Sequence, residues 1–168
     1  VYKRQTIRNV EGKEYDESYD KLLLSPGANP VKPPLEGINS EGIFTLRNVE
    51  DTDHIKAYIS DKQVKRAVVV GAGFIGLEMA ENLHHAGVAV SVVEMGNQVM
   101  APIDFSMASL VHQHLMDKGV NLYLEKAVAS FERDGKLFKV IFKNGQSISA
   151  DIVILSIGVR PETTLARA

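Results

Sequence analysis

The sequence contains no cysteine and no tryptophan. Without cysteine the chain cannot form a disulfide, bind a metal through thiolates or use a cysteine nucleophile. It also lacks any run of roughly eighteen uninterrupted apolar residues, the length that a membrane-spanning helix needs. The first ten residues, VYKRQTIRNV, lack the apolar core of a signal peptide. We therefore expect a cytoplasmic protein with no membrane partner. The first residue is Val1 rather than methionine, which indicates a stretch of a longer protein.

An excess of positive charge is also missing. The 168 residues carry a formal net charge of -2, and their basic residues are scattered along the sequence. A protein that holds a phosphate backbone needs a basic patch, so we expect no nucleic-acid partner. The apolar fraction of 45% and the charged fraction of 24% are those of an average soluble globular protein. This composition excludes intrinsic disorder but does not select a function.

The first forty-two residues are organised differently from the rest of the chain. A pair of strands with a turn near Glu11 and Gly12 is followed by the apolar run YDKLLLSPGANP, which stops at Pro26 and Gly27. Residues 29–42 then contain three of the six prolines, which favours an extended connector. We predict a domain boundary there, with an edge piece and connector over residues 1–42 and one domain over residues 43–168.

From residue 43 onward, helical and strand patterns alternate as in an α/β protein with a parallel sheet. The strands have β-branched apolar runs, typical of strands buried on both faces. Two turn signals, Asp134-Gly135 and Asn144-Gly145, divide a later section of alternating residues into a three-stranded antiparallel meander. The expected elements are a strand at 43–45, a helix at 49–62, a strand at 66–70, a helix at 74–86, a strand at 89–94, a helix at 104–118, a strand at 121–124, the meander at 128–150 and a strand at 151–155. The fold class is thus a Rossmann-like parallel sheet with helices and a meander.

A glycine motif lies between the strand at 66–70 and the helix that follows it. Gly71, Gly73 and Gly76 have the G-x-G-x-x-G spacing of a dinucleotide-binding turn. The first glycine allows the tight turn, the second lets the backbone approach a pyrophosphate, and the third lets the helix lie close to the strand. The amides near Phe74 and Ile75 then face the phosphates at the positive end of the helix dipole.

An acidic residue follows at the expected distance. Glu94 ends the next strand, eighteen residues after Gly76, where a carboxylate accepts hydrogen bonds from an adenosine ribose. A carboxylate repels a 2′-phosphate, and the following segment, residues 95–98, contains no cation to offset it. We therefore predict NADH in preference to NADPH. The alternative is an ordinary glycine turn followed by a strand-end glutamate without a ligand.

Four segments in order, YDKLLLSPGANP, VVVGAGFIGLEMAENL, VVEMGNQVMAPID and DIVILSIGVRPETTLA, closely resemble the pyridine nucleotide-disulfide oxidoreductases. Within that family the chain is most similar to the branch of coenzyme A-disulfide reductase, NADH oxidase and persulfide reductase. The resemblance implies a homodimeric parent protein in which an FAD domain is interrupted by this NADH-binding domain. In such a parent, hydride passes from NADH to the flavin and then to a disulfide, persulfide or oxygen acceptor.

The same resemblance assigns roles to further residues. It implies that Ser25, Pro26 and Gly27 pass near the flavin, that Met95 lies by the adenosine, and that Gly158 lies near the nicotinamide end. It also implies that Glu78 lies near the nicotinamide and flavin. The alternative for Glu78 is a purely structural one, in which its charge favours the helix dipole by about 0.3–1 kcal/mol.

Several parts of the family pattern are absent from these residues: the N-terminal FAD glycine motif, the redox cysteine, the later Gly-Asp and the dimerisation domain. We therefore expect the chain to be inactive alone, with no catalytic residue of its own. A stand-alone dinucleotide-binding or interaction module remains an alternative. A complete single-domain dehydrogenase is less consistent, because the Tyr58-x-x-x-Lys62 pair precedes the glycine motif rather than following it. The histidine pairs, 84 with 85 and 112 with 114, are poorly spaced for metal binding, so we expect no metal.

Overall fold

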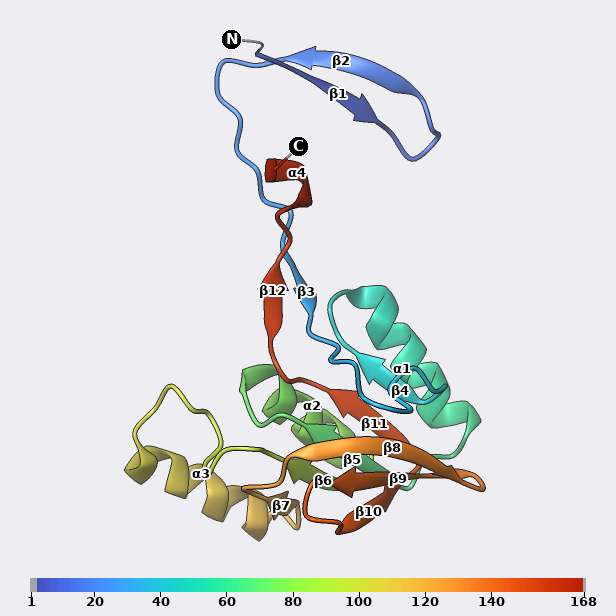
Figure 1. Ribbon diagram of the computed structural model, residues 1–168, viewed down its shortest axis with the longest axis vertical. Coiled ribbons are helices and arrows are strands. Elements are labelled where there is room, and N and C mark those ends of the chain that lie inside the picture. Colours follow the sequence, from blue (N-terminus) through green and yellow to red (C-terminus); the bar gives the residue numbers. More distant parts are fainter. Residues whose placement is uncertain (1–2, 168) are drawn as a thin grey trace. The chain divides into compact units, whose positions relative to one another are not determined.

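A computed structural model of the chain describes residues 3–167, which form two compact units (Figure 1). One unit comprises residues 3–27 together with residues 161–167, and the other comprises Ala28–Arg160. The second unit contains the glycine motif and all three long helices. The proline-rich connector predicted from the sequence belongs to this same unit, and the assignment of residues 1–42 to the edge of an FAD domain stays a prediction.

A parallel five-stranded sheet forms the centre of the larger unit, in the order β4-β11-β5-β6-β7. Its strands are β4 (Ile43–Thr45), β5 (Arg66–Val70), β6 (Ala89–Val93), β7 (Asn121–Tyr123) and β11 (Ile152–Leu155). All four residues of β11 are buried, as are the last four of β5. This burial on both faces explains why these strands read as continuous apolar runs in the sequence.

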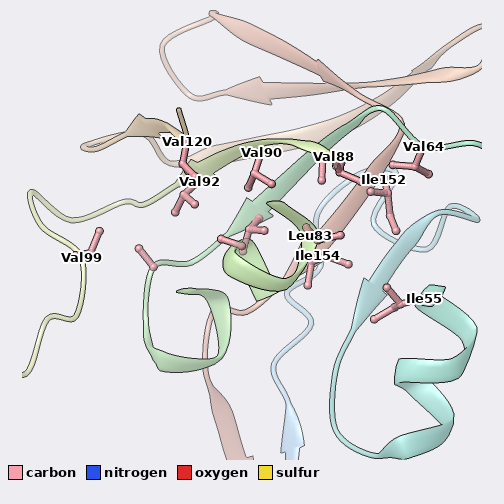
Figure 2. Close-up of a cluster of buried hydrophobic side chains, with 14 of the residues drawn as sticks. Ile55, Val64, Leu83, Val88, Val90, Val92, Val99, Val120, Ile152 and Ile154 are labelled. Atoms are coloured by element: carbon pink, nitrogen blue, oxygen red, sulfur yellow. The ribbon is translucent and has the colours of Figure 1, made fainter. Parts of the chain in front are cut away.

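Three helices cover one face of the sheet: α1 (Val49–Asp61), α2 (Phe74–His85) and α3 (Phe105–Asp117). Asn48 caps α1 through a reciprocal capping box with Asp51. Ile55 of α1 and Leu83 of α2 belong to the same buried apolar cluster as alternate residues of the strands, such as Val90 and Ile154 (Figure 2). The packing of this helix layer on the sheet therefore accounts for one of the two cores.

An antiparallel meander covers the opposite face, with β8 (Val128–Asp134), β9 (Leu137–Phe142) and β10 (Ser147–Ala150) in the order β10-β9-β8. Phe138 of β9 and Phe131 of β8 pack in a second core with Val68, Val70 and Val153. Successive residues of β5 thus alternate between the two cores, as the period of a strand requires. The domain has three layers, which confirms the predicted Rossmann-like α/β fold with a meander.

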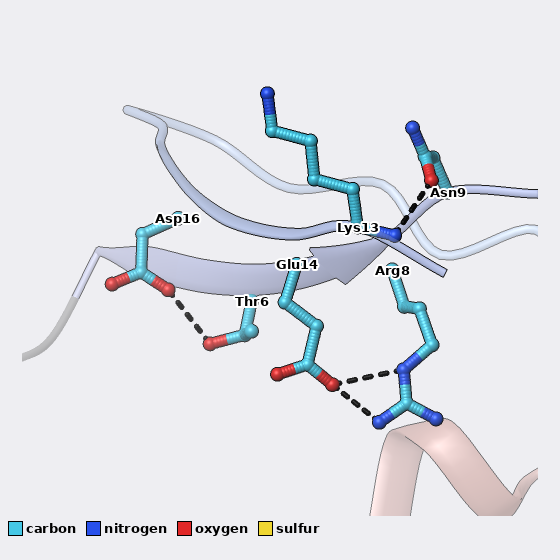
Figure 3. A network of polar contacts seen from close by, with 6 residues as sticks. All are labelled: Thr6, Arg8, Asn9, Lys13, Glu14 and Asp16. Carbon is cyan, nitrogen blue, oxygen red and sulfur yellow. Dashed lines mark hydrogen bonds and ion pairs between the residues drawn. The ribbon is translucent and has the colours of Figure 1, made fainter. Parts of the chain in front are cut away.

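The smaller unit contains an exposed hairpin formed by β1 (Arg4–Arg8) and β2 (Glu14–Ser18). Every residue of β2 is exposed, and polar side chains pair across the strands (Figure 3). The Thr6 hydroxyl donates to Asp16 Oδ1 at 2.8 Å, and Arg8 Nε donates to Glu14 Oε1 at 2.8 Å. The strand pair and its turn are as predicted.

Three short elements were not predicted from the sequence: β3 (Ala28–Pro30), β12 (Val159–Pro161) and α4 (Thr164–Arg167). β3 and β12 form a two-stranded sheet, although each has only three residues. Such short segments contain too few residues to show a strand or helix period. Within residues 3–167, no helix combines the length and the apolar character that crossing a bilayer requires.

Candidate functional site

A cleft of about 670 Å³ lies within the larger unit, at the carboxyl ends of β5, β6 and β11. The residues directly after these three strands, Gly71, Glu94 and Ser156, all line it. The crevice outside the carboxyl ends of parallel strands is where open α/β sheets bind their ligands. The cleft therefore lies where the sequence motif predicts a dinucleotide.

The glycine turn is packed too tightly for side chains at two of its positions. Gly71 has a φ of +99°, and a Cβ there would lie 2.4 Å from the carbonyl oxygen of Ser156. A Cβ on Gly76, which is buried in α2, would lie 2.0 Å from the carbonyl oxygen of Gly71. In this backbone a side chain at the first or the third glycine would meet the turn itself, as the motif predicts.

Gly73 differs, because a Cβ built on it meets no atom within 4 Å and its φ is -79°. Gly73 is the N-cap of α2, and no side chain within residues 3–167 forms a capping hydrogen bond with the start of this helix. The N–H groups of a helix's first turn have no partner within the helix, and here they begin beside Phe74 and Ile75, which both line the cleft. The open space at Gly73 and these amides fit a bound diphosphate.

Glu94 is held in place by the backbone before any ligand binds. Its Oε2 accepts from the N–H of Ala72 at 2.9 Å, and its Oε1 accepts from the N–H of Gly96 at 2.8 Å. A carboxylate has about four lone-pair sites, so two remain for a ligand. The half-buried side chain lines the cleft beside the glycine turn, which fits the predicted contact with a ribose.

Met95 and Gly158 also line the cleft, on different elements. Met95 directly follows Glu94, and its side chain is exposed. Gly158 has a φ of +113°, follows β11, and its carbonyl oxygen accepts from the N–H of Val31 at 2.9 Å. Met95 is therefore next to Glu94 in the chain, whereas Gly158 reaches the cleft from the end of β11. Their individual contacts with a cofactor stay predictions.

Besides Gly76, which packs behind the glycine turn, four predicted residues do not line this cleft. Glu78 is exposed on α2 and lines a separate cavity of about 270 Å³ between α2 and α3. Ser25, Pro26 and Gly27 belong to the smaller unit. The roles of these four residues toward the nicotinamide and the flavin stay predictions.

The structure adds residues to the cleft that the sequence analysis did not consider. Lys126, Ala127 and Val128 enter it from the start of the meander, and Lys143 enters it from the turn between β9 and β10. The connector also contributes, through Pro30, Pro33 and Leu35. These residues lie far from the glycine motif in sequence, and only the meander's hairpin signals hinted that this segment turns back toward the sheet.

Tyr58 and Lys62, which resemble a dehydrogenase pair in the sequence, have structural roles. Tyr58 packs edge-on against Phe44, with ring centroids 5.2 Å apart, and its hydroxyl lies 3.4 Å from the carbonyl oxygen of Asp151. Lys62 forms an exposed ion pair with Glu41 at 3.6 Å. Neither Tyr58 nor Lys62 lines the large cleft, so this pair cannot serve a reaction there. Within residues 3–167, no group of three or more histidines and carboxylates is arranged to hold a metal ion.

Comparisons with known proteins agree with this geometry. The chain is 50% identical to reduced CoADR-RHD from Bacillus anthracis, with a TM-score of 0.90 over 98% of this chain and 30% of that one. It is 39% identical to an NADH oxidase from Methanocaldococcus jannaschii over 94% of this chain and 35% of the oxidase. Its relatives also include a coenzyme A disulfide reductase and a persulfide reductase. The chain thus spans about a third of the length of these proteins.

A solved oxidase with bound cofactor is similar as well. The water-forming NADH oxidase from Lactobacillus brevis, bound to NADH, is 33% identical with a TM-score of 0.83, covering 98% of this chain and 36% of that one. An engineered form of it is bound to NADPH. The family model of the pyridine nucleotide-disulphide oxidoreductases matches residues 1–168 of this chain. The chain belongs to the pyridine nucleotide-disulphide oxidoreductase family.

Proposed function

We propose that this chain is the NADH-binding domain of an FAD-dependent oxidoreductase that passes hydride from NADH to the flavin and on to a disulfide, persulfide or oxygen acceptor. The observation that carries the proposal is the carboxylate of Glu94, fixed by two backbone N–H groups at the rim of a cleft that begins at the glycine turn. This pairing of an anion-binding helix start with a ribose-binding carboxylate suits a dinucleotide.

The residues of this chain bind and orient the dinucleotide. The amides at the start of α2 would receive the diphosphate, and the free lone pairs of Glu94 would accept from the adenosine ribose. Phe74, Ile75 and Met95 are 63%, 42% and 73% exposed, respectively, and offer apolar surface that a bound cofactor would cover. NADH supplies the hydride itself when it is bound, and the domain's contribution is its position.

The proposal includes a preference for NADH over NADPH. Glu94 places a negative charge where NADPH carries its 2′-phosphate. The engineered NADPH-bound oxidase supports this, because an aspartate-to-alanine replacement lies eighteen positions after a glycine-to-alanine replacement, and an alanine-to-arginine replacement comes next. Glu94 lies at the same spacing after Gly76. Removal of the carboxylate and addition of a cation at this place accompany NADPH binding in that relative.

Calorimetric titration of the 168-residue chain with NADH tests the proposal. We expect saturable binding with one dinucleotide per chain, and at least about tenfold weaker binding of NADPH, the scale of one unfavourable charge contact. Ala substitution of Gly73 is the matched variant, because it fills the open space in the cleft without a steric conflict in the fold. A folded chain that does not bind NADH at millimolar concentration would refute the dinucleotide site, and equal affinity for both cofactors would refute the preference.

We further propose that turnover requires parts of a longer, cytoplasmic, homodimeric flavoprotein. The support is that the chain spans 35% of the NADH oxidase and 30% of CoADR-RHD, and that it has no cysteine to exchange with a sulfur acceptor. Absorbance of NADH in the presence of added FAD and a dye acceptor is the assay. The chain alone should show no oxidation of NADH, and clear turnover would refute this part.

A second candidate function is a dinucleotide-binding or interaction module without turnover, which the lack of the family's FAD glycine motif in these residues favours. The two functions differ in what the complete gene encodes. A flanking FAD glycine motif and a redox cysteine would support the reductase, whereas a reading frame without them would support the module. Sequencing the complete reading frame decides between them.

A further inference from the structure

We propose that Lys126 and Lys143 determine how strictly the cofactor cleft discriminates between NADH and NADPH. This inference rests on the proposed function, in which Glu94 binds the adenosine ribose and repels a 2′-phosphate. The two lysines place positive charge at the same end of the cleft and oppose that repulsion. The site would then prefer NADH through a balance of charges rather than through Glu94 alone.

Backbone hydrogen bonds place both lysines at the adenosine end. The N–H of Lys126 donates to the carbonyl oxygen of Glu94 at 2.9 Å. The N–H of Lys143 donates to the carbonyl oxygen of Ala127 at 2.8 Å, so the turn that bears Lys143 lies directly beside the segment that bears Lys126. All four residues line the cleft. The backbone of Lys126 is therefore joined directly to Glu94, whose carboxylate is proposed to bind the ribose, and Lys143 lies beside the segment that carries Lys126.

Neither ammonium group is neutralised by a carboxylate within the described part of the chain. The three ion pairs found among residues 3–167 involve neither Lys126 nor Lys143. The Nζ of half-buried Lys126 donates to Oε1 of Gln146 at 3.0 Å, and the Nδ2 of Asn144 donates to the same oxygen at 2.9 Å. A neutral acceptor thus holds the Lys126 head group at the meander turn, and two of its three N–H donors remain available.

The charges that line the cleft decide the direction of the effect. Among the described residues that line the cleft, Glu94 is the one carboxylate, and Lys126 and Lys143 are the two cations. NADPH differs from NADH by a single phosphate on the adenosine ribose, which carries close to two negative charges at neutral pH, as phosphate monoesters do. The attraction of the lysines therefore acts more strongly on NADPH, because its additional charge lies at their end of the cleft.

The test compares dissociation constants of NADH and NADPH for the full chain and for the double variant Lys126→Gln with Lys143→Gln. NADPH binding should weaken roughly threefold to tenfold more than NADH binding, the scale of one or two exposed ion pairs. Lys139→Gln is the matched control, because Lys139 is an exposed lysine of β9 that does not line the cleft. Repeating the comparison in the Glu94→Gln background keeps NADPH binding measurable.

A second measurement needs no variant. Since exposed charges are screened by salt, the affinity of the unmodified chain for NADPH should fall more steeply with ionic strength than its affinity for NADH. If the ratio of the NADH and NADPH dissociation constants is the same in the lysine variant as in the unmodified chain, this inference is overturned. NADH binding by the unmodified chain would then still support the proposed function. A folded chain that binds neither cofactor overturns the proposed function itself.

Discussion

Replacing Gly71 with alanine should destabilise the fold, whereas the same change at Gly73 should not. At Gly71 the backbone has a φ of +99°, where a Cβ costs about 1–2 kcal/mol. The added Cβ would also lie 2.4 Å from the carbonyl oxygen of Ser156, and relieving such overpacking costs about 1–3 kcal/mol. Together we expect the free energy of unfolding to fall by about 2–5 kcal/mol, a large part of the roughly 5–15 kcal/mol typical of a domain.

Urea denaturation followed by circular dichroism measures this difference. Gly73→Ala is the matched variant, because its Cβ meets no atom within 4 Å and its φ is -79°. We expect it to change the free energy of unfolding by less than about 1 kcal/mol, the difference between glycine and alanine at an N-cap. NADH binding should nevertheless weaken by about tenfold or more, because the methyl group lies where the pyrophosphate approaches. An unchanged urea midpoint for Gly71→Ala would show that the tight turn is not required.

Four further substitutions test how much individual polar groups contribute to stability. Glu94→Ala should lower the free energy of unfolding by about 1–3 kcal/mol, because two backbone N–H groups lose their acceptor, and urea denaturation of the unliganded chain checks this. Ser156→Ala should leave stability unchanged or raise it by up to about 1 kcal/mol, because its buried hydroxyl has no hydrogen-bond partner among residues 3–167. A lower thermal midpoint would contradict this. Asp151→Ala should lower the free energy of unfolding in urea by about 1–2 kcal/mol, because Asp151 Oδ2 accepts from the N–H groups of Lys65 and Arg66 at 3.1 and 2.8 Å. Arg66→Gln should change it by less than about 0.5 kcal/mol, because the ion pair between Arg66 and Asp151 is largely exposed.

Much of the fold could be predicted because its central strands are continuous apolar runs. Residues 67–70 and 152–155 are buried, and the glycine motif determines how the first of these strands connects to its helix. Strand order could not be predicted, since β11 inserts between β4 and β5 through contacts made far along the chain. Three-residue segments such as β3 and β12 show no period at all.

The candidate site could also be predicted only in part. Gly71, Gly73, Gly76 and Glu94 were predicted because a local motif determines their spacing, and the structure places them around one cleft, with Gly76 packed behind the turn. Lys126 and Lys143 were not predicted as site residues, because their position at the cleft depends on the register of the meander. Residues 95–98, directly after the carboxylate, contain no cation, whereas Lys126 and Lys143 reach the cleft from the meander.

The turn between β9 and β10 is a surface hairpin whose residues 143–146 are all exposed. Loops of this kind tolerate substitution and changes of length better than the strands they join. Because Lys143 of this turn also lines the cleft, its proposed role implies that a change of charge there would alter the choice between NADH and NADPH while the apolar layers keep their packing. Cofactor preference would then be adjustable at a place that is uncoupled from the folding of the sheet.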